Sequence, residues 1–333
     1  MIGYYVHHHG RGHLQRTLAV AARTGPGVGL SSLPRPAEWV GHWIELPRDD
    51  DEDVSRDPTA GGRLHWVPER HRGLSRRMAE ISSWIDDVDP ELMVVDVSVE
   101  VALLARLHGV PVVTMAQPGD RRDAPHALAH GIARSVVAPW PEHAHGVLRS
   151  TVDDRLVTVG AFSRFDDRPP VPRPRGDRRR VLLMLGAGGH AVTPAQAEAA
   201  RNQTPDWDWR VLGGDEGPWV EDPWDELCAA DVVITHAGQN AVAEVAAARR
   251  PAVIVPQARP FGEQDALAAA LALLQPSPAV VRSAFPQDGW ADLLEEADAH
   301  DGEAWIAWND GQGAERAAKV LHEELARRGP VSR

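Results

Sequence analysis

Short apolar runs alternate with stretches of helical periodicity along the first half of the chain. The runs are predicted strands, at residues 2–6, 91–98, 110–117, 133–141 and 154–162. The stretches at residues 13–23 and 99–109 are predicted helices with their apolar positions on one side. Strands separated by helices are typical of βαβ units in a parallel sheet. The pattern therefore predicts a doubly wound α/β domain over residues 1–163.

The pattern starts again after a segment that interrupts it. Residues 164–178 are rich in Pro and Arg and lack apolar periodicity, as a semi-rigid linker does. The strands predicted beyond it are within residues 180–190, 207–214, 230–238 and 251–257, and the helices are residues 239–250, 263–274 and a closing helix at 313–328. We therefore expect a second domain over residues 179–333. Two doubly wound, Rossmann-like domains would face each other across a cleft, with ligands at the carboxyl ends of the strands.

The composition narrows the class of protein. A chain of 333 residues is long enough for two domains. The formal net charge of -13 argues against a nucleic-acid-binding protein, which usually carries a basic patch. Cys228 is the only cysteine, so we expect no internal disulfide and a reducing, cytoplasmic compartment. We also expect neither a signal peptide nor a membrane span, because no apolar run approaches about 20 residues.

The opening residues carry histidines around a Gly-Arg-Gly turn. Gly10 and Gly12 let the backbone approach a ligand closely, and His13 follows them at the predicted start of a helix. An imidazole there can act as a general base, because its ordinary pKa is about 6.5. Metal binding by the three consecutive histidines is the weaker hypothesis. Adjacent strand residues point to opposite faces, so only His7 and His9 could converge.

Asp96 ends a buried apolar run, at the sheet edge where ligands bind. Two interpretations stay open at this point. The carboxylate can accept a hydrogen bond from His13 and hold its tautomer, or it can cap the helix that follows.

Two other groups of polar residues have a metal interpretation that we do not favour. Asp50 and Asp53 lie in the acidic stretch at residues 47–63, and such runs are usually solvated loops. His126 and His130 are four residues apart and could face one way on a helix, as zinc ligands do. Without a third ligand in sight, we interpret them as surface or acceptor-groove residues.

Two glycine-rich turns in the second half each follow a predicted strand and open a helix. The first holds Gly186, Gly188 and Gly189, and the second is the His-Ala-Gly-Gln-Asn stretch at residues 236–240. Backbone N–H groups in such turns and at helix N-termini bind phosphate oxygens. The two turns predict an anionic ligand in the second domain.

Residues 235–271 resemble the donor signature of a known group of enzymes. They contain His-x-Gly-x-Asn, a Glu six residues after the Gly, a Pro after the next strand, and an acidic-Gln pair. This pattern is similar to that of the two-domain nucleotide-sugar glycosyltransferases of the GT-B fold. The match is to the family 28 and family 1 type, which includes the peptidoglycan N-acetylglucosaminyltransferase. The amide usual after the acidic-Gln pair is missing, since Leu267 or Ala268 stands there.

The resemblance implies an inverting, metal-independent transfer of a sugar to an acceptor hydroxyl, without a cofactor. The donor would be a nucleoside-diphosphate sugar, by default a UDP-sugar. His13 would be the catalytic base and Asp96 its orienting partner, with Gly12 and Arg16 on the acceptor side. The implied donor-binding residues are Arg164, Gly188, Gly189, His236, Gly238, Asn240, Ala241, Glu244, Glu263 and Gln264. Glu244 would bind the ribose, the Glu-Gln pair would bind the sugar, and the others would hold the diphosphate.

Three alternatives stay open on the same scaffold. The turn at residues 10–16 also resembles the Gly-x-Gly-His-x-x-Arg turn of sugar-nucleotide hydrolases of nonulosonate synthesis, in which His13 would activate water and Arg16 would be the matching arginine. A UDP-sugar epimerase and a non-catalytic helper protein are the other two. The acceptor is a lipid-linked sugar, a polysaccharide or a natural product. A lipid-linked acceptor would bring the protein to a membrane surface. We expect no nucleic-acid partner.

Overall fold

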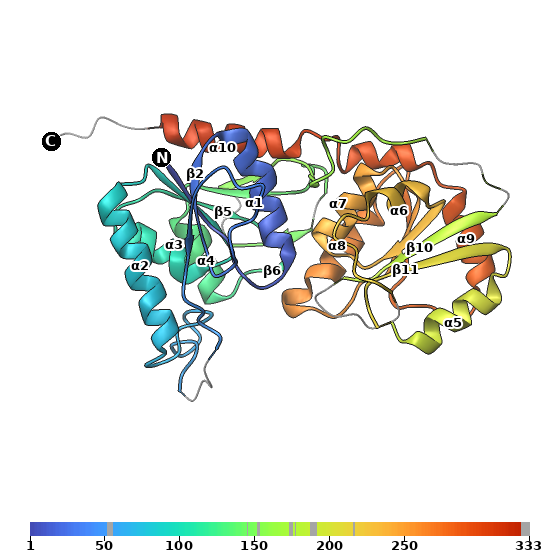
Figure 1. Cartoon of the computed structure of the whole chain (residues 1–333), viewed down its shortest axis with the longest axis horizontal. Helices are drawn as coiled ribbons and strands as arrows, with labels where there is room; N and C mark the ends of the chain where they lie inside the picture. The colour runs from blue at the N-terminus through green and yellow to red at the C-terminus, as the bar shows by residue number, and fades with distance from the viewer. Residues whose placement is uncertain are drawn as a thin grey trace. The chain divides into compact units, whose positions relative to one another are not determined.

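The chain divides into two compact units, which are described separately below. Unit 1 comprises residues 1–139, 149–159 and 314–333, and unit 2 comprises residues 140–148 and 160–313. The computed structural model (Figure 1) describes residues 1–51, 56–144, 146–151, 154–172, 176, 178–186, 192–215 and 217–327. None of the helices in these ranges is both long and apolar enough to cross a membrane.

Unit 1 is built on a seven-stranded sheet in the order β3-β2-β1-β4-β5-β7-β9, and its paired strands are parallel. The strands are β1 (Ile2–Tyr5), β2 (Gly27–Ser31), β3 (Gly41–Glu45), β4 (Leu92–Asp96), β5 (Val112–Met115), β7 (Ser135–Ala138) and β9 (Leu156–Thr158). The central strands β1, β4 and β5 are buried along their whole length. Their continuous apolar runs are therefore those of a parallel sheet covered on both faces.

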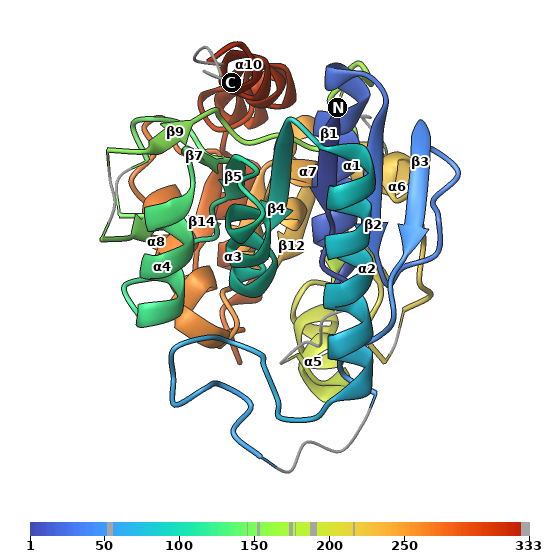
Figure 2. The same cartoon turned by 90° about the vertical axis from the view of Figure 1, so that its left-hand side faces the viewer.

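The helices of unit 1 cover both faces of this sheet. They are α1 (Arg11–Thr24), α2 (Arg72–Val88), α3 (Val99–Leu107), α4 (Ala124–Ile132) and α10 (Gly313–Ala326). Two short strands, β6 (Gly119–Asp120) and β8 (Leu148–Arg149), pair separately. Tyr4 of β1 contacts Thr24 of α1, whereas Tyr5 accepts a hydrogen bond from Arg77 of α2. Successive strand residues point to opposite faces, so α1 and α2 lie on opposite sides of the sheet (Figure 1 and, along the axis through both helices, Figure 2).

The closing helix α10 belongs to unit 1, whereas the sequence pattern predicted it in the second domain. Glu324 is buried there and accepts a 2.6 Å hydrogen bond from the Ser135 hydroxyl of β7. Arg316 donates to the carbonyl of Val159, which ends the second segment of unit 1. An amphipathic helix can be recognised from its period, but the sheet that it covers cannot.

Unit 2 has a five-stranded parallel sheet in the order β11-β10-β12-β13-β14. Its strands are β10 (Arg179–Met184), β11 (Trp207–Leu212), β12 (Val232–Thr235), β13 (Ala252–Ile254) and β14 (Ala279–Val281). Its helices are α5 (Pro194–Gln203), α6 (Trp224–Ala229), α7 (Gln239–Ala247), η1 (Pro260–Gly262), α8 (Glu263–Leu271), α9 (Trp290–Asp298) and η2 (Gly302–Ala307). Apolar residues of α5 and α9 pack with the sheet in one core. The strand–helix alternation predicted for this half is confirmed.

Candidate functional site

The turn from β1 to α1 places His13 at the start of a helix, as predicted. Gly10 is the N-cap of α1 and has a φ of 84°, in the left-handed region that favours glycine. Gly12 lies inside the first helical turn, so it does not use this freedom. His13 is the third residue of α1, and its side chain keeps 21 % of its surface exposed.

His13 and Asp96 contact each other across the edge of the sheet in unit 1. The Nδ1 atom of His13 lies 3.0 Å from Oδ2 of Asp96, the last residue of β4. Arg16, one helical turn after His13, donates from Nη2 to both carboxylate oxygens at 2.8 and 3.0 Å. The Gln117 amide donates to Oδ1 at 3.4 Å. The helix-cap interpretation of Asp96 is wrong, because Ser98 caps α3.

These contacts keep Asp96 ionised and hold Nδ1 of His13 against its carboxylate. Burial alone would raise the pKa of Asp96, but Arg16 and His13 outweigh it and lower that pKa below its ordinary value. An ionised carboxylate accepts a hydrogen bond from Nδ1–H, and in that tautomer the lone pair of the imidazole is on Nε2. His13 can therefore take up a proton at Nε2 while Asp96 stabilises the resulting charge.

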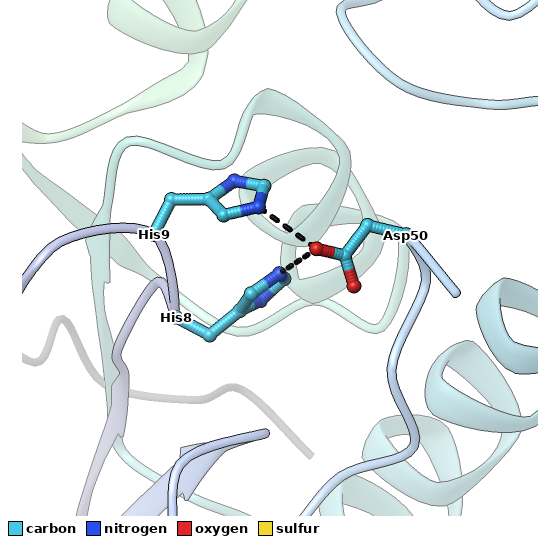
Figure 3. A group of neighbouring side chains, drawn as sticks. All are labelled: His8, His9 and Asp50. Atoms are coloured by element: carbon cyan, nitrogen blue, oxygen red, sulfur yellow. Dashed lines mark hydrogen bonds and ion pairs between the residues drawn. The ribbon is translucent and has the colours of Figure 1, made fainter. Parts of the chain in front are cut away.

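The three consecutive histidines do not pair as the strand pattern predicted. The strand β1 ends at Tyr5, so the alternation of faces does not extend to them. His8 and His9, rather than His7 and His9, turn toward one carboxylate, that of Asp50 (Figure 3). Asp50 is therefore not a residue of a solvated loop, and its side chain is only 20 % exposed. Asp53 lies outside the described residues.

His126 and His130 are buried, so their assignment to the surface is wrong. They lie on α4, with ring centroids 6.0 Å apart. His126 contacts Asp123 through Nδ1, and the other oxygen of Asp123 lies 3.1 Å from Nε2 of His65. Burial lowers the pKa of His126 to about 4, so the ring is neutral at physiological pH. Two histidines and one carboxylate thus form a second polar cluster in unit 1.

In unit 2, the turn between β12 and α7 is packed around the ring of His236. Its Nδ1 accepts a 2.9 Å hydrogen bond from the backbone N–H of Gly238, so the proton of the neutral ring is on Nε2. A Cβ added at Gly238 would lie 2.4 Å from Cε1 of the ring, and one at Gly186 would lie 2.5 Å from Nε2. Burial lowers the pKa of His236 to about 4, and the charge of Arg259 adds to this. A neutral N–H donor therefore lies against the glycine turn after β10.

A cavity of about 300 Å³ opens at the carboxyl ends of the strands in unit 2. Its lining includes His236, Gln257 and Phe285. Gln264 of α8 is buried beside it, accepts from the backbone N–H of Gln257 at 2.9 Å, and lies 3.4 Å from Nδ1 of His236. The cavity has the position at which ligands bind in doubly wound folds.

Arg164 and Glu244 form an ion pair within unit 2. The Nε atom of Arg164 donates to Oε1 of Glu244 at 2.8 Å, and Nη1 donates to the carbonyl of Glu221 at 2.7 Å. Burial raises the pKa of Glu244, and the charge of Arg164 only partly opposes this. The resemblance assigns Arg164 to the diphosphate and Glu244 to the ribose, but in this structure the two residues bind each other.

The other donor-side residues lie at helix starts or outside the described chain. Asn240 and Ala241 are in the first turn of α7, and Glu263 is the first residue of α8. Gly188 and Gly189 lie outside the described residues, as does the centre of the first glycine turn.

The sequence pattern missed two amides that contact site residues. Gln117 donates to Asp96 and follows β5, and Gln257 binds Gln264 and follows β13. Each comes shortly after a buried strand of a parallel sheet. A polar side chain at the carboxyl end of such a strand is the signal that would have found them.

The comparisons with known proteins agree with the resemblance to GT-B glycosyltransferases. Residues 224–275, from the start of α6 to just beyond the end of α8, match the model of the glycosyltransferase family 28 C-terminal domain. The resemblance to this family is confirmed. The matched segment contains the β12–α7 turn, Glu244 and the Glu263–Gln264 pair.

Two curated relatives carry the same name, UDP-N-acetylglucosamine--N-acetylmuramyl-(pentapeptide) pyrophosphoryl-undecaprenol N-acetylglucosamine transferase. The one from Rubrobacter xylanophilus is 31% identical over 174 residues, which are 46% of this chain and 50% of the relative. The one from Sorangium cellulosum is 31% identical over 181 residues, 47% of this chain and 43% of the relative. The chain thus spans about half the length of the curated relatives it matches.

Solved structures of glycosyltransferases share the fold over nearly the whole chain. The glycosyltransferase of kitacinnamycin has a TM-score of 0.67 at 16% identity and covers 97% of this chain and 98% of its own. The calicheamicin glycosyltransferase CalG4 gives 0.66 at 18% identity, with 99% of both chains covered. The Acinetobacter baumannii MurG gives 0.63 at 16% identity, covering 97% and 99%. The predicted fold, two Rossmann-like domains of the GT-B type, is confirmed.

Proposed function

We propose that the protein is an inverting glycosyltransferase that moves a sugar from a nucleoside-diphosphate sugar to an acceptor hydroxyl. The observation that carries the proposal is the His13–Asp96 hydrogen bond, in a chain whose other unit contains the family 28 segment. The relatives that match are named as transferases that use UDP-N-acetylglucosamine. A UDP-sugar is therefore the donor we propose first.

Unit 2 would bind the donor. The first backbone N–H groups of α7 and the Nε2–H of His236 are donors suited to diphosphate oxygens. Glu244 can accept hydrogen bonds from two vicinal ribose hydroxyls. Arg164 would leave Glu244 and pair with the diphosphate, since a guanidinium binds phosphate oxygens bidentately. These groups stabilise the departing nucleoside diphosphate without requiring a metal ion.

Unit 1 would supply the base. As the acceptor oxygen attacks the anomeric carbon, its proton passes to Nε2 of His13. The bond between that carbon and the phosphate oxygen breaks, and the nucleoside diphosphate leaves with the bonding electrons. A single displacement inverts the configuration at the anomeric carbon. Asp96 stabilises the imidazolium that forms, because it remains ionised between His13 and Arg16.

Hydrolysis of the same donor is the second candidate, because the turn that contains His13 and Arg16 also resembles that of sugar-nucleotide hydrolases. The Gly-x-Gly-His-x-x-Arg turn places this arginine on the Asp96 carboxylate, 3.1 Å from Nδ1 of His13. In a hydrolase the same base would activate water. The two reactions share donor, base and leaving group, so only the nucleophile distinguishes them.

The test is a thermal-shift panel of nucleoside diphosphates and their sugars, followed by turnover with the donor that binds. We expect release of nucleoside diphosphate that depends on an acceptor and is lost in the H13Q variant. The acceptor panel would contain a lipid-linked sugar, oligosaccharides and natural-product aglycones. Release at the same rate without an acceptor would establish the hydrolase. No binding of any nucleoside diphosphate would refute both.

A further inference from the structure

A cluster of two imidazoles and one carboxylate lies beside the proposed base and is not used by the proposed reaction. The Nε2 atoms of His8 and His9 lie 3.2 and 2.8 Å from the same oxygen, Oδ2 of Asp50 (Figure 3). The three ligand atoms all lie within 4.8 Å of one another. The histidines follow β1 directly, and Asp50 comes from the loop after β3, so two separate segments of unit 1 meet here.

The orientation of His8 is the second observation. Its side chain is 2% exposed, and in the described part of the chain neither of its ring nitrogens has a hydrogen-bond partner. Nε2 lies 3.2 Å from Oδ2 of Asp50, but the contact does not have the geometry of a hydrogen bond. Burial of the ring removes hydration that the 3.2 Å approach to the Asp50 carboxylate replaces only in part. The Nε2 atoms of His8 and His9 thus both face Oδ2 of Asp50, as the ligands of one shared metal ion would.

The spacing and chemistry of these atoms suit a transition-metal ion. Zinc–nitrogen and zinc–oxygen bonds of about 2.0–2.1 Å place the ligand atoms of a tetrahedral site roughly 3.3 Å apart. The observed 3.2 and 2.8 Å are close to this value. Two imidazoles and one carboxylate form a donor set that binds Zn²⁺ and leaves a position for water or a further ligand.

Arg48 is the competing cation, and it does not block the site. It donates to both oxygens of Asp50, from Nε at 2.9 Å and from Nη2 at 2.7 Å. A carboxylate oxygen has two lone pairs, so Oδ2 can accept from Arg48 and bind an ion at once. In such an arrangement the arginine would orient the carboxylate, as hydrogen-bonded partners of metal ligands commonly do. Its side chain is also 52% exposed and can move away.

We infer that His8, His9 and Asp50 bind a divalent transition-metal ion of the Zn²⁺ type. The ion would join the segment before α1 to the loop after β3. The backbone N–H of His9 donates to Nδ1 of His7, and the ring centroid of His7 lies 5.7 Å from that of His13. The site is therefore close enough to the proposed base to hold the start of α1 in place, although the transfer step itself needs no metal.

The experiment measures binding of Co²⁺ and Zn²⁺ to the full chain after treatment with a chelator. Bound Co²⁺ is read from its visible absorption, which strengthens when the ion leaves water for a four-coordinate protein site. Zn²⁺ is read from the rise in apparent Tm that accompanies binding to the folded state. The variants are H9Q and D50N, with H42Q as the matched control. His9 and His42 are both exposed histidines of unit 1, so neither substitution disturbs the core.

We expect H9Q and D50N to bind Co²⁺ at least about 10-fold more weakly, while H42Q binds it as the wild type does. The Tm of metal-free H9Q should equal that of the metal-free wild type, which shows that the loss is not unfolding. Unchanged Co²⁺ absorption in H9Q would refute the site. Co²⁺ absorption that survives H9Q but disappears in H65Q would place the ion at the His65–Asp123–His126 cluster. That result would also refute the site at His8, His9 and Asp50.

Discussion

Asp96 of unit 1 and Glu244 of unit 2 are both shielded carboxylates that bind an arginine, but their pKa values move in opposite directions. The side chain of Asp96 is 1% exposed and that of Glu244 is 14% exposed. Burial raises the pKa of each, yet the pKa of Asp96 ends below its ordinary value and that of Glu244 above it. The depth of burial cannot explain this, because the more deeply buried group is the more acidic one.

The difference lies in the donors that each carboxylate has. Asp96 accepts from Arg16 on both oxygens, from His13 on one, and from the amide of Gln117. Among the described residues, the Glu244 side chain accepts only the hydrogen bond from Nε of Arg164. The charges of Arg16 and His13 lower the pKa of Asp96 against the effect of burial, and their hydrogen bonds to the carboxylate add to this. The Asp96 carboxylate thus has several donors built into the protein, whereas the Glu244 carboxylate can accept further hydrogen bonds.

This contrast fits the two roles that we propose. An orienting group must stay ionised throughout the reaction, so its donors are built into the protein. A ligand-binding group must have capacity left, and ribose hydroxyls would supply the donors that Glu244 lacks. The amide substitutions D96N and E244Q remove the charge of each carboxylate but keep its shape, so they test the two roles separately.

The D96N substitution should have the largest effect. It removes the charge that stabilises the His13 imidazolium and presents an amide that can favour the wrong tautomer. We expect kcat to fall by about 10²- to 10⁴-fold, the range of general-base catalysis, with donor affinity nearly unchanged. Turnover and calorimetric titration with the nucleoside diphosphate measure the two quantities. An equal loss in donor affinity would contradict the assignment of Asp96 to orientation.

The E244Q substitution should lower donor affinity more than kcat, which is the opposite of the result expected for D96N. A hydrogen bond to a charged group contributes about 1.5–3 kcal/mol, so the donor should bind roughly 10- to 100-fold more weakly. The value of kcat at saturating donor should change much less than in D96N. The comparison of Glu244 with Asp96 fails if E244Q lowers kcat and leaves the donor affinity intact.

The sequence predicts some strands and misses others, and the reason is physical. The strand β10 contains the apolar run Val-Leu-Leu-Met, β12 is Val-Val-Ile-Thr, and each is followed in the sequence by the glycines of a turn that we interpret as phosphate-binding. By contrast, β2 is Gly-Val-Gly-Leu-Ser and β3 begins with Gly-His, and neither was predicted as a strand. A Cβ at Gly29 would lie 2.1 Å from the ring of Trp43, so this glycine makes room for a large neighbour. Local propensity does not carry that information.

Within the candidate site, the sequence predicted positions but not partners. His13 and Asp96 are 83 residues apart, and the parallel sheet brings them together because both follow or end central strands. The contact of Arg16 with Asp96, and that of Arg164 with Glu244, depend on side-chain rotamers that no motif encodes. The convergence of His8 and His9 is not predicted, because the alternation of faces along a strand does not hold for residues beyond Tyr5, where β1 ends.

The G238A substitution sharpens the comparison by disturbing the donor side without touching either carboxylate. Gly238 has a φ of -80°, which alanine adopts freely, so any effect comes from the 2.4 Å approach of the new Cβ to His236. We expect the unfolding free energy to fall by about 1–3 kcal/mol, as overpacking usually costs, and donor binding to weaken. The control is G131A, where a Cβ on α4 meets nothing within 4 Å. Equal stability of the two variants would show that the turn around His236 is not tightly packed.

The smallest effect concerns the stability of the free protein as a function of pH. Because the pKa of Glu244 is raised on folding, protonation of this group stabilises the folded state. That contribution is fully present below the ordinary value of 4.5 and is lost as the pH rises through the folded pKa. E244Q has no such loss, so its Tm should match the wild type at low pH and exceed it at neutral pH. The excess should stay below roughly 4 °C, the shift that about 1 kcal/mol produces in a domain of this size.

D96N should show the reverse sign. The lowered pKa of Asp96 stabilises the wild type above the ordinary value of 3.8, so the Tm of the variant should fall below that of the wild type as the pH rises. Thermal unfolding of the three proteins across this range measures both differences, and the same sign for both would show that donor number does not separate the two carboxylates.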